Sequence, residues 1–206
     1  MAERKRGQPV SGTERTVAGA DWYGRDFSGE VHERVLFTDL DLTEATGTGA
    51  TFTECTFRRA KFNVSAHVEG AFVNCSFLAC NFFETRFTGC KMVGSTFDKC
   101  SWDLTKVEGG NWSHVGLPGA DLGRATFTGV RMREADLTGV RAVDGVLRDC
   151  DLSGASLQSA KLRDCDLRGS DLSALEPLSV ELAGAIITYE QALVIAQALG
   201  LDVRAE

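Results

Sequence analysis

The stretch AFVNCSFLACNFFETRFTGCKMVGSTFDKCSW, residues 71–102, decides the fold, because a large apolar residue occupies every fifth position after Phe72. The same column continues in one register from Trp22 to Ile187, and eleven of the twelve Phe residues lie in it. A helix repeats every 3.6 residues and a strand every 2, so neither produces a sustained period of five. We expect this column to form a common core, interrupted at five positions: His32, Gly47, His67, Ala142 and Pro177.

A second column, two residues before the first, holds mostly small side chains. All seven cysteines of the chain fall in it, and no His or carboxylate lies beside them in the column. A free Cys packs as a small apolar side chain, whereas a metal or nucleophile site needs His or acidic partners. The sequence therefore predicts structural cysteines, with no metal site and no cofactor. They are Cys55, Cys75, Cys80, Cys90, Cys100, Cys150 and Cys165.

Composition narrows the class of protein. Hydrophobic residues make up 43% and charged residues 25% of the 206 residues, which excludes a disordered or collagen-like chain. No apolar run is long enough to cross a membrane or to act as a secretion signal. The net charge of −7 disfavours binding to nucleic acid phosphates. We expect a cytoplasmic protein that contacts neither membrane nor nucleic acid directly.

The units Ala120-Asp121-Leu122-Gly123-Arg124 and Ala135-Asp136-Leu137-Thr138-Gly139 show the repeated pattern most clearly. They resemble pentapeptide repeats, and the resemblance covers Asp21 to about Ile187. It implies an all-β solenoid, a right-handed quadrilateral β-helix of about eight coils, over residues 19–187. Four five-residue sides make one coil, so residues 20 apart stack on the same side. A filled rod of this kind has no substrate pocket, and we expect no enzymatic activity.

The two ends of the chain differ in character. Residues 1–18 are expected to be a flexible N-terminal arm. Its basic cluster at residues 4–6 fits a solvated tail better than the alternative, a contact with nucleic acid. Residues 188–206 are expected to form a C-terminal capping helix and tail, because Thr188 and Gln191 fit a capping box and Gly200 fits a helix stop. The helix is apolar nearly all round, which predicts a homodimer. The expected interface residues are Leu193, Ile195, Leu199, Leu201 and Val203.

One of the four sides carries an excess of acidic residues. Its outward positions hold nine acids against five bases, whereas each of the other sides has a net charge of about −1. A narrow column of carboxylates has an axial charge density like that of a DNA duplex, and would attract a basic DNA-binding surface. The alternative is that the charge only keeps the rod soluble. The nine acids are Asp21, Asp41, Glu44, Glu84, Asp103, Asp121, Asp144, Asp164 and Glu181.

An apolar collar is also expected near the first third of the rod. Four consecutive sides carry an apolar residue just after the central position, and a fifth such residue stacks over one of them. The collar fits either an external contact or packing between neighbouring coils. Its residues are Val68, Val73, Leu78, Phe83 and Val93.

Among pentapeptide-repeat proteins, the chain most resembles the MfpA and Qnr group. The resemblance rests on the Phe-rich first half, the Leu-rich second half, the segment 90–97 and the closing segment 187–203, and the lack of insertions is more like MfpA. It implies a dimeric DNA mimic that binds DNA gyrase. Topoisomerase IV is a second target that the resemblance implies. Such a protein protects the enzyme from quinolones or a natural topoisomerase toxin. The alternative function is a structural or adaptor scaffold whose protein partner is unrelated to DNA.

Overall fold

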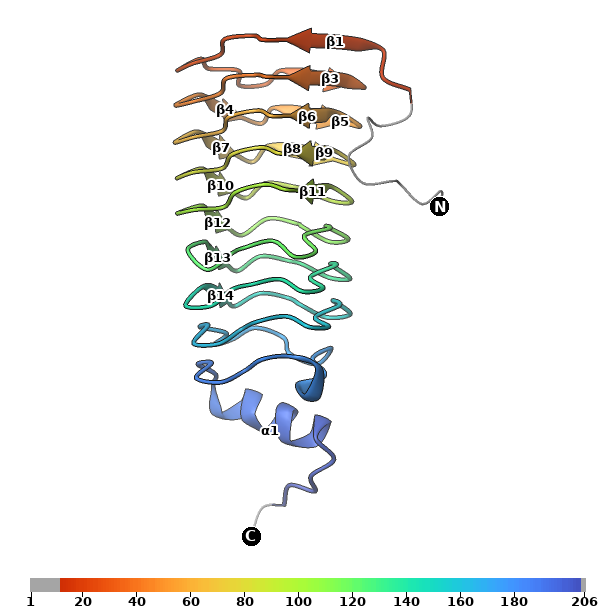
Figure 1. Cartoon of the computed structure of the whole chain (residues 1–206), viewed down its shortest axis with the longest axis vertical. Helices are drawn as coiled ribbons and strands as arrows, with labels where there is room; N and C mark the ends of the chain where they lie inside the picture. The colour runs from red at the N-terminus through yellow and green to blue at the C-terminus, as the bar shows by residue number, and fades with distance from the viewer. Residues whose placement is uncertain (1–11, 205–206) are drawn as a thin grey trace.

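The computed structural model describes residues 12–204 as a stack of turns, with one helix at the C-terminal end (Figure 1). The chain is an all-β solenoid, a right-handed quadrilateral β-helix built from short parallel strands. The strands are β1 (Arg15–Ala18), β2 (Val31–Glu33), β3 (Val35–Thr38), β4 (Thr46–Thr48), β5 (Thr51–Thr53), β6 (Thr56–Arg58), β7 (Ala66–Val68), β8 (Ala71–Val73), β9 (Ser76–Leu78), β10 (Arg86–Thr88), β11 (Thr96–Asp98), β12 (Lys106–Glu108), β13 (Thr126–Thr128) and β14 (Val146–Arg148). A 3₁₀ turn (Pro177–Ser179) and α1 (Tyr189–Ala198) follow.

The strands stack in a fixed register of 20 residues. Three sides of the coil form sheets, with orders β1-β3-β6-β9-β11, β14-β13-β12-β10-β7-β4 and β2-β5-β8. In the first sheet Phe37 pairs with Phe57, and Phe57 pairs with Phe77. The fourth side is held by isolated parallel bridges such as Asp21 with Asp41. Four sides of five residues therefore make each coil, as the period of five predicts.

The large column forms the core as stacked rings. Phe57 and Phe77 lie with ring centroids 4.9 Å apart and nearly parallel, and Phe77 stacks on Phe97 at 4.5 Å. The stacks continue on the other sides, and below Phe127 the column changes to Leu side chains that are also buried. Each buried ring or Leu contributes roughly 1.5–3 kcal/mol of transfer free energy, so stability accumulates as coils stack.

The small column fills the corners and also donates hydrogen bonds. The Cys90 thiol donates to the carbonyl of His67, 23 residues earlier, at 3.3 Å. Thr85 makes the equivalent bond to the Phe62 carbonyl at 2.7 Å. Cys, Ser and Thr thus share one role, because each is small and each reaches the same carbonyl of the coil above. Six of the seven cysteines are buried, and Cys100 is half-buried.

The N-terminal boundary differs from the expectation. Residues 15–18 were expected in the flexible arm, but they form β1, which pairs in parallel with β3. Val17 packs against the core because it lies five residues before Trp22 and so belongs to the large column. The remainder of the expected arm at residues 1–11, including the basic cluster at 4–6, lies outside the described residues.

Helix α1 closes the C-terminal end. The capping box is confirmed, because the Thr188 hydroxyl accepts from the Gln191 amide and the Gln191 side chain accepts from the Thr188 amide. The Gln191 side-chain amide also donates to the carbonyls of Leu167 and Ser170, both at 2.7 Å. One glutamine therefore holds the start of α1 and ties it to the last coil. Within residues 12–204, no helix has the length and apolarity needed to cross a membrane.

Candidate functional site

The acidic face is the side of the rod that has no named strand. We define it by the outward residues at 21–24 and at every later step of 20, to 181–184. Bridges join most of its successive turns, as between Lys61 and Asn81. Between its outward residues the central column points inward, with Leu42, Phe62 and Phe82 almost completely buried. The buried column thus fixes the positions of the outward side chains on a rigid backbone.

All nine predicted acids lie on the surface of this face. Asp41 and Asp103 are half-buried, and the other seven are exposed. Glu44, Glu84 and Asp144 occupy corner positions with φ of 59°, 53° and 58°. This left-handed conformation turns the chain at the corner, and the same position recurs at each turn of the face. The acidic face therefore carries carboxylates along most of its length.

Ion pairs on the acidic face neutralise part of its charge. Four of its five bases pair with its own acids: Lys61 with Asp41 (3.2 Å), Arg124 with Asp103 (3.1 Å), Arg141 with Asp121 (4.0 Å) and Lys161 with Glu181 (3.5 Å). These exposed pairs are worth little in stability. Their main consequence is that some carboxylates of the acidic face are neutralised by a neighbouring base, whereas others are not. Across the described chain, the acids of this face that make no ion pair are Asp21, Glu44, Glu84, Asp144 and Asp164.

Asp41 shows how local structure keeps a carboxylate charged. Its side chain accepts hydrogen bonds from Thr43, including one from the Thr43 amide at 3.0 Å, and it pairs with Lys61. The Thr43 hydrogen bonds and the Lys61 charge lower the pKa of Asp41 below its ordinary value, against the opposing effect of partial burial. Asp41 is therefore ionised at neutral pH.

The predicted apolar collar is only weakly exposed. Val68 is 39% exposed, whereas Val73, Leu78, Phe83 and Val93 are half-buried. Sequence reasoning missed Val64, which is 47% exposed at a corner of the acidic face. Its signal was an apolar residue in a column that otherwise holds mostly polar residues or Gly. The collar thus presents separate apolar side chains and not a continuous apolar surface.

The predicted dimer residues lie on and beyond α1. Leu199, Leu201 and Val203 are exposed, and Leu193 is half-buried. Ile195 packs partly against the core of its own chain, so it helps to seal the last coil. Four further apolar residues that sequence reasoning missed are exposed at this end: Leu178, Ile186, Tyr189 and Val194.

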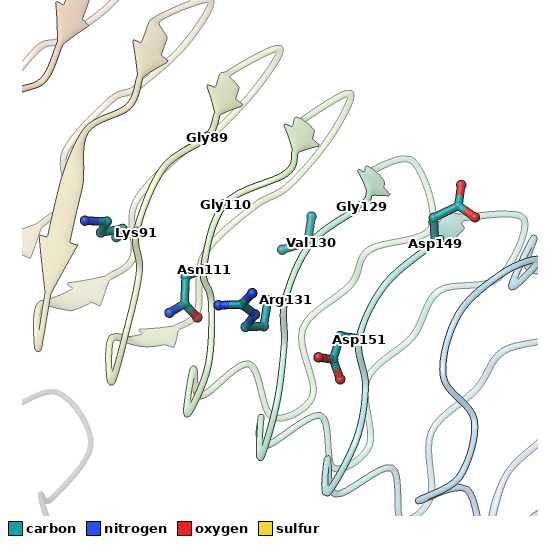
Figure 2. A pocket seen from close by; sticks show the side chains of 9 residues that line it. All are labelled: Gly89, Lys91, Gly110, Asn111, Gly129, Val130, Arg131, Asp149 and Asp151. Atoms are coloured by element: carbon teal, nitrogen blue, oxygen red, sulfur yellow. The ribbon is translucent and has the colours of Figure 1, made fainter.

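A second feature of the surface is a shallow groove of about 480 Å³, shown in Figure 2. Successive turns supply Lys91, Asn111, Arg131 and Asp151 to its edge, and three glycines widen it. Asp151 pairs with Arg133, whereas Lys91 and Arg131 make no ion pair with any described residue. The groove has mixed charge, and its lining contains neither Ser, Cys nor His.

The buried thiols of Cys90 and Cys165 and the buried imidazole of His67 are held in their neutral forms. Burial raises the pKa of Cys90 to about 11 and that of Cys165 to about 12. Burial also lowers the pKa of His67 to about 3. His67 points into the core, where its ring stacks on Phe87 at 4.9 Å and its Nε2 lies 2.9 Å from the Ser65 hydroxyl. Among residues 12–204, no group of three or more His, Cys, Asp or Glu is arranged to hold a metal ion.

Comparison with known families identifies the repeat. The family model described as pentapeptide repeats matches eight copies, over residues 33–63, 113–141 and 145–173. Among curated protein sequences, none is significantly similar to the chain.

A solved structure shares the fold. A trypsin-treated variant of QnrB1, described as a plasmid-mediated fluoroquinolone resistance protein, matches with a TM-score of 0.51 and 21% identity. The match covers 92% of this chain and 97% of that one. HetL, a pentapeptide repeat protein involved in heterocyst differentiation regulation from the cyanobacterium Nostoc sp. strain PCC 7120, matches with a TM-score of 0.44 and 18% identity. That match covers 83% of this chain and 82% of HetL.

Proposed function

Because the chain is a pentapeptide-repeat protein, we propose that its acidic face is a binding surface that mimics DNA. The partner is DNA gyrase, and binding protects the enzyme from quinolones or a natural topoisomerase toxin. Topoisomerase IV is a further target of the same kind. The protein acts in the cytoplasm as a binding protein and not as an enzyme.

The distribution of unpaired charge carries this proposal. Once the internal ion pairs are set aside, five carboxylates and one guanidinium, that of Arg163, remain on the acidic face. Unpaired charges attract a partner more strongly than charges already neutralised by a neighbour, and they speed association with an oppositely charged surface. The 20-residue repeat places these charges on one side of the rod, so this side presents a row of negative charge to a partner. The likeness to QnrB1 supports the scaffold, and the charge pattern supports the partner.

The proposal is tested by removing the unpaired charges. A variant with Glu44→Gln, Glu84→Gln, Asp144→Asn and Asp164→Asn removes four of the five carboxylates without changing side-chain size. In a gyrase supercoiling assay with and without a quinolone, we expect the wild-type protein to preserve supercoiling activity in the presence of the drug. We expect the variant to need about tenfold more protein for the same effect.

A matched control separates the effect of the acidic face from the effect of net charge. The control carries Glu69→Gln, Glu108→Gln, Asp149→Asn and Asp171→Asn, which lie on other sides of the rod and are also exposed. It changes the net charge by the same amount, and we expect it to behave like the wild type. Equal loss in both variants, or no effect of the wild-type protein at micromolar concentration, would contradict the proposal.

We also propose a homodimer through the C-terminal end. Leu199, Leu201 and Val203 are exposed apolar residues at this end of the rod, as are Tyr189 and Leu178. Light scattering after size exclusion would give about twice the 22.2 kDa chain mass. Leu199→Asp with Leu201→Asp is expected to give the monomer mass with an unchanged circular dichroism spectrum. A monomeric wild type at micromolar concentration would contradict the dimer.

The alternative function is a scaffold for a partner unrelated to DNA. The exposed Val64 and Val68 favour it, because apolar side chains near one coil suit a protein contact that does not depend on charge. In the assays above, a scaffold protein would leave supercoiling unchanged. Binding through these residues would also persist at high salt, whereas binding through the acidic face weakens.

A further inference from the structure

A row of hydrogen-bond donors lies on the side of the rod opposite the acidic face, two of the four sides away from it. Lys91, Asn111 and Arg131 occupy the same position of three successive turns, and parallel bridges join each to the next. Stacked coils are about 4.8 Å apart, so each cation is one coil away from Asn111. The three side chains line one edge of the shallow groove in Figure 2. We call these three residues the donor row.

Neither cation of the donor row is neutralised by the protein itself. Within residues 12–204, the Lys91 ammonium and the Arg131 guanidinium make no ion pair and no side-chain hydrogen bond. Arg133, only two residues after Arg131, is by contrast paired with Asp151. Both cations of the donor row are exposed. Their charge is therefore available to an anion from solution.

Asn111 adds a neutral donor between the two cations. Its Oδ1 accepts hydrogen bonds from the Ser113 amide at 3.1 Å and from the Ser113 hydroxyl at 2.8 Å. These bonds fix the orientation of the side-chain amide, because only its oxygen can accept them. The Nδ2 group therefore keeps two N–H donors, and no acceptor in the described part of the chain bonds to them. Figure 2 shows the Arg131 guanidinium turned toward Asn111.

The two carboxylates of the groove lie at its other end and do not neutralise the donor row. Asp151 is already paired with Arg133. Asp149 leans toward the following turn, where its Oδ1 lies 2.0 Å from the place that a Cβ on Gly169 would take. Figure 2 shows this carboxylate directed away from Arg131. The upper part of the groove therefore offers donors to a ligand, and the acids stand apart from them.

Glycine keeps the groove open beside the donor row. Gly110 has a φ of 87°, and a Cβ added there would lie 2.1 Å from the carbonyl oxygen of Cys90. The left-handed backbone and the close approach both exclude a side chain at this position. Two more positions of the lining, Gly89 and Gly129, are also glycine. A ligand can therefore reach the donor row without meeting side chains at these three positions.

We propose that the donor row binds a phosphate monoester, seated over Asn111 between the two cations. Such a group offers three acceptor oxygens and a charge of about −1.5 to −2 at neutral pH, which matches an ammonium, a guanidinium and an amide. A carboxylate has two oxygens and a single charge, and bidentate pairing with Arg131 alone would satisfy it. The ester belongs either to a small molecule or to a phosphorylated side chain. The inference is independent of the proposed function, because it concerns the opposite side of the rod.

The test is an NMR titration of the ¹⁵N-labelled full-length protein in a phosphate-free buffer at constant ionic strength. The probes are methyl phosphate and the peptide acetyl-Gly-Gly-phosphoserine-Gly-Gly-amide. We expect saturable shifts centred on the amides of residues 91, 111 and 131. The same peptide with Glu in place of phosphoserine is expected to bind several-fold more weakly. Tighter binding of the phosphopeptide than of methyl phosphate would identify a phosphorylated side chain as the ligand, and equal binding would identify a small phosphate ester.

Four variants locate the site. Arg131→Gln removes the bidentate donor and is expected to weaken binding about tenfold. Asn111→Asp puts a carboxylate of the same size in the middle of the donor row and is expected to abolish saturable binding. Glu69→Gln is expected to strengthen binding about twofold, because Glu69 reaches toward Gly89 of the lining and repels an anion. Arg163→Gln is the control, since it removes an unpaired guanidinium of the acidic face, and it is expected to leave binding unchanged.

Several results would overturn the inference. They are equal binding of the Glu peptide and the phosphopeptide, equal effects of Arg131→Gln and Arg163→Gln, or shifts spread evenly over the rod. The lack of saturable shifts with both probes at millimolar concentration would also contradict it. Arg131→Gln leaves the acidic face intact and is expected to act on gyrase like the wild type, so the two proposals can fail separately.

Discussion

At the scale of single residues, the space beside Gly47 is filled by a ring from the neighbouring coil. Gly47 interrupts the large column, and an added Cβ there would lie 2.3 Å from Cε2 of Phe27. The ring of Phe27, from the coil above, therefore takes the space that a side chain at 47 would fill. This exchange depends on rotamers in two coils, so the sequence of either coil alone does not predict it.

His67 gives a test at the residue scale. Its pKa in the folded protein is about 3, below the value of about 6.5 for an unperturbed His. Between these values the unfolded chain binds more protons, so stability falls as the pH drops below 6.5. From pH 7.5 to 4.5 this loss amounts to about 2–3 kcal/mol.

The measurement compares wild type with His67→Leu by urea unfolding at both pH values. Leu is common in this column and cannot titrate, so acidification is expected to destabilise the variant by about 2–3 kcal/mol less than the wild type. Carboxylates titrate in both proteins, and the difference isolates the histidine. Equal losses in the two proteins would show that His67 is not buried in its neutral form.

At the scale of elements, sequence patterns predict the start of the C-terminal helix α1 better than they predict the N-terminal strand β1. The capping box at Thr188 was visible because its two side chains are three residues apart. The second role of Gln191, its bonds to Leu167 and Ser170, was not visible because it requires the helix to be placed against the last coil. Strand β1 carried a readable signal, since Val17 continues the large column, but mixed charge and Gly around it favoured an arm.

Gln191 gives the test at this scale. Gln191→Ala removes two hydrogen bonds to the last coil and half of the capping box, leaving buried carbonyls without donors. We expect a loss of about 2–3 kcal/mol in the free energy of unfolding and faster amide hydrogen exchange in residues 162–175. Gln197→Ala, at an exposed position of the same helix, is the control. A loss no larger than that of the control would mean that α1 does not seal the solenoid.

At the scale of the whole molecule, the 20-residue register assigns each charge to a side, and the acidic face follows directly from it. The sequence does not show which carboxylates are neutralised, because this depends on side-chain reach between turns, as for Arg124 and Asp103.

DNA mimicry is tested most directly by competition for gyrase. A fluorescent DNA duplex bound to gyrase is titrated with the protein, and its release is followed by anisotropy. We expect the wild-type protein to displace the duplex, and the variant lacking the carboxylates of Glu44, Glu84, Asp144 and Asp164 to require about tenfold more protein. If gyrase binds duplex and protein together without displacement, the acidic face does not occupy the place of DNA.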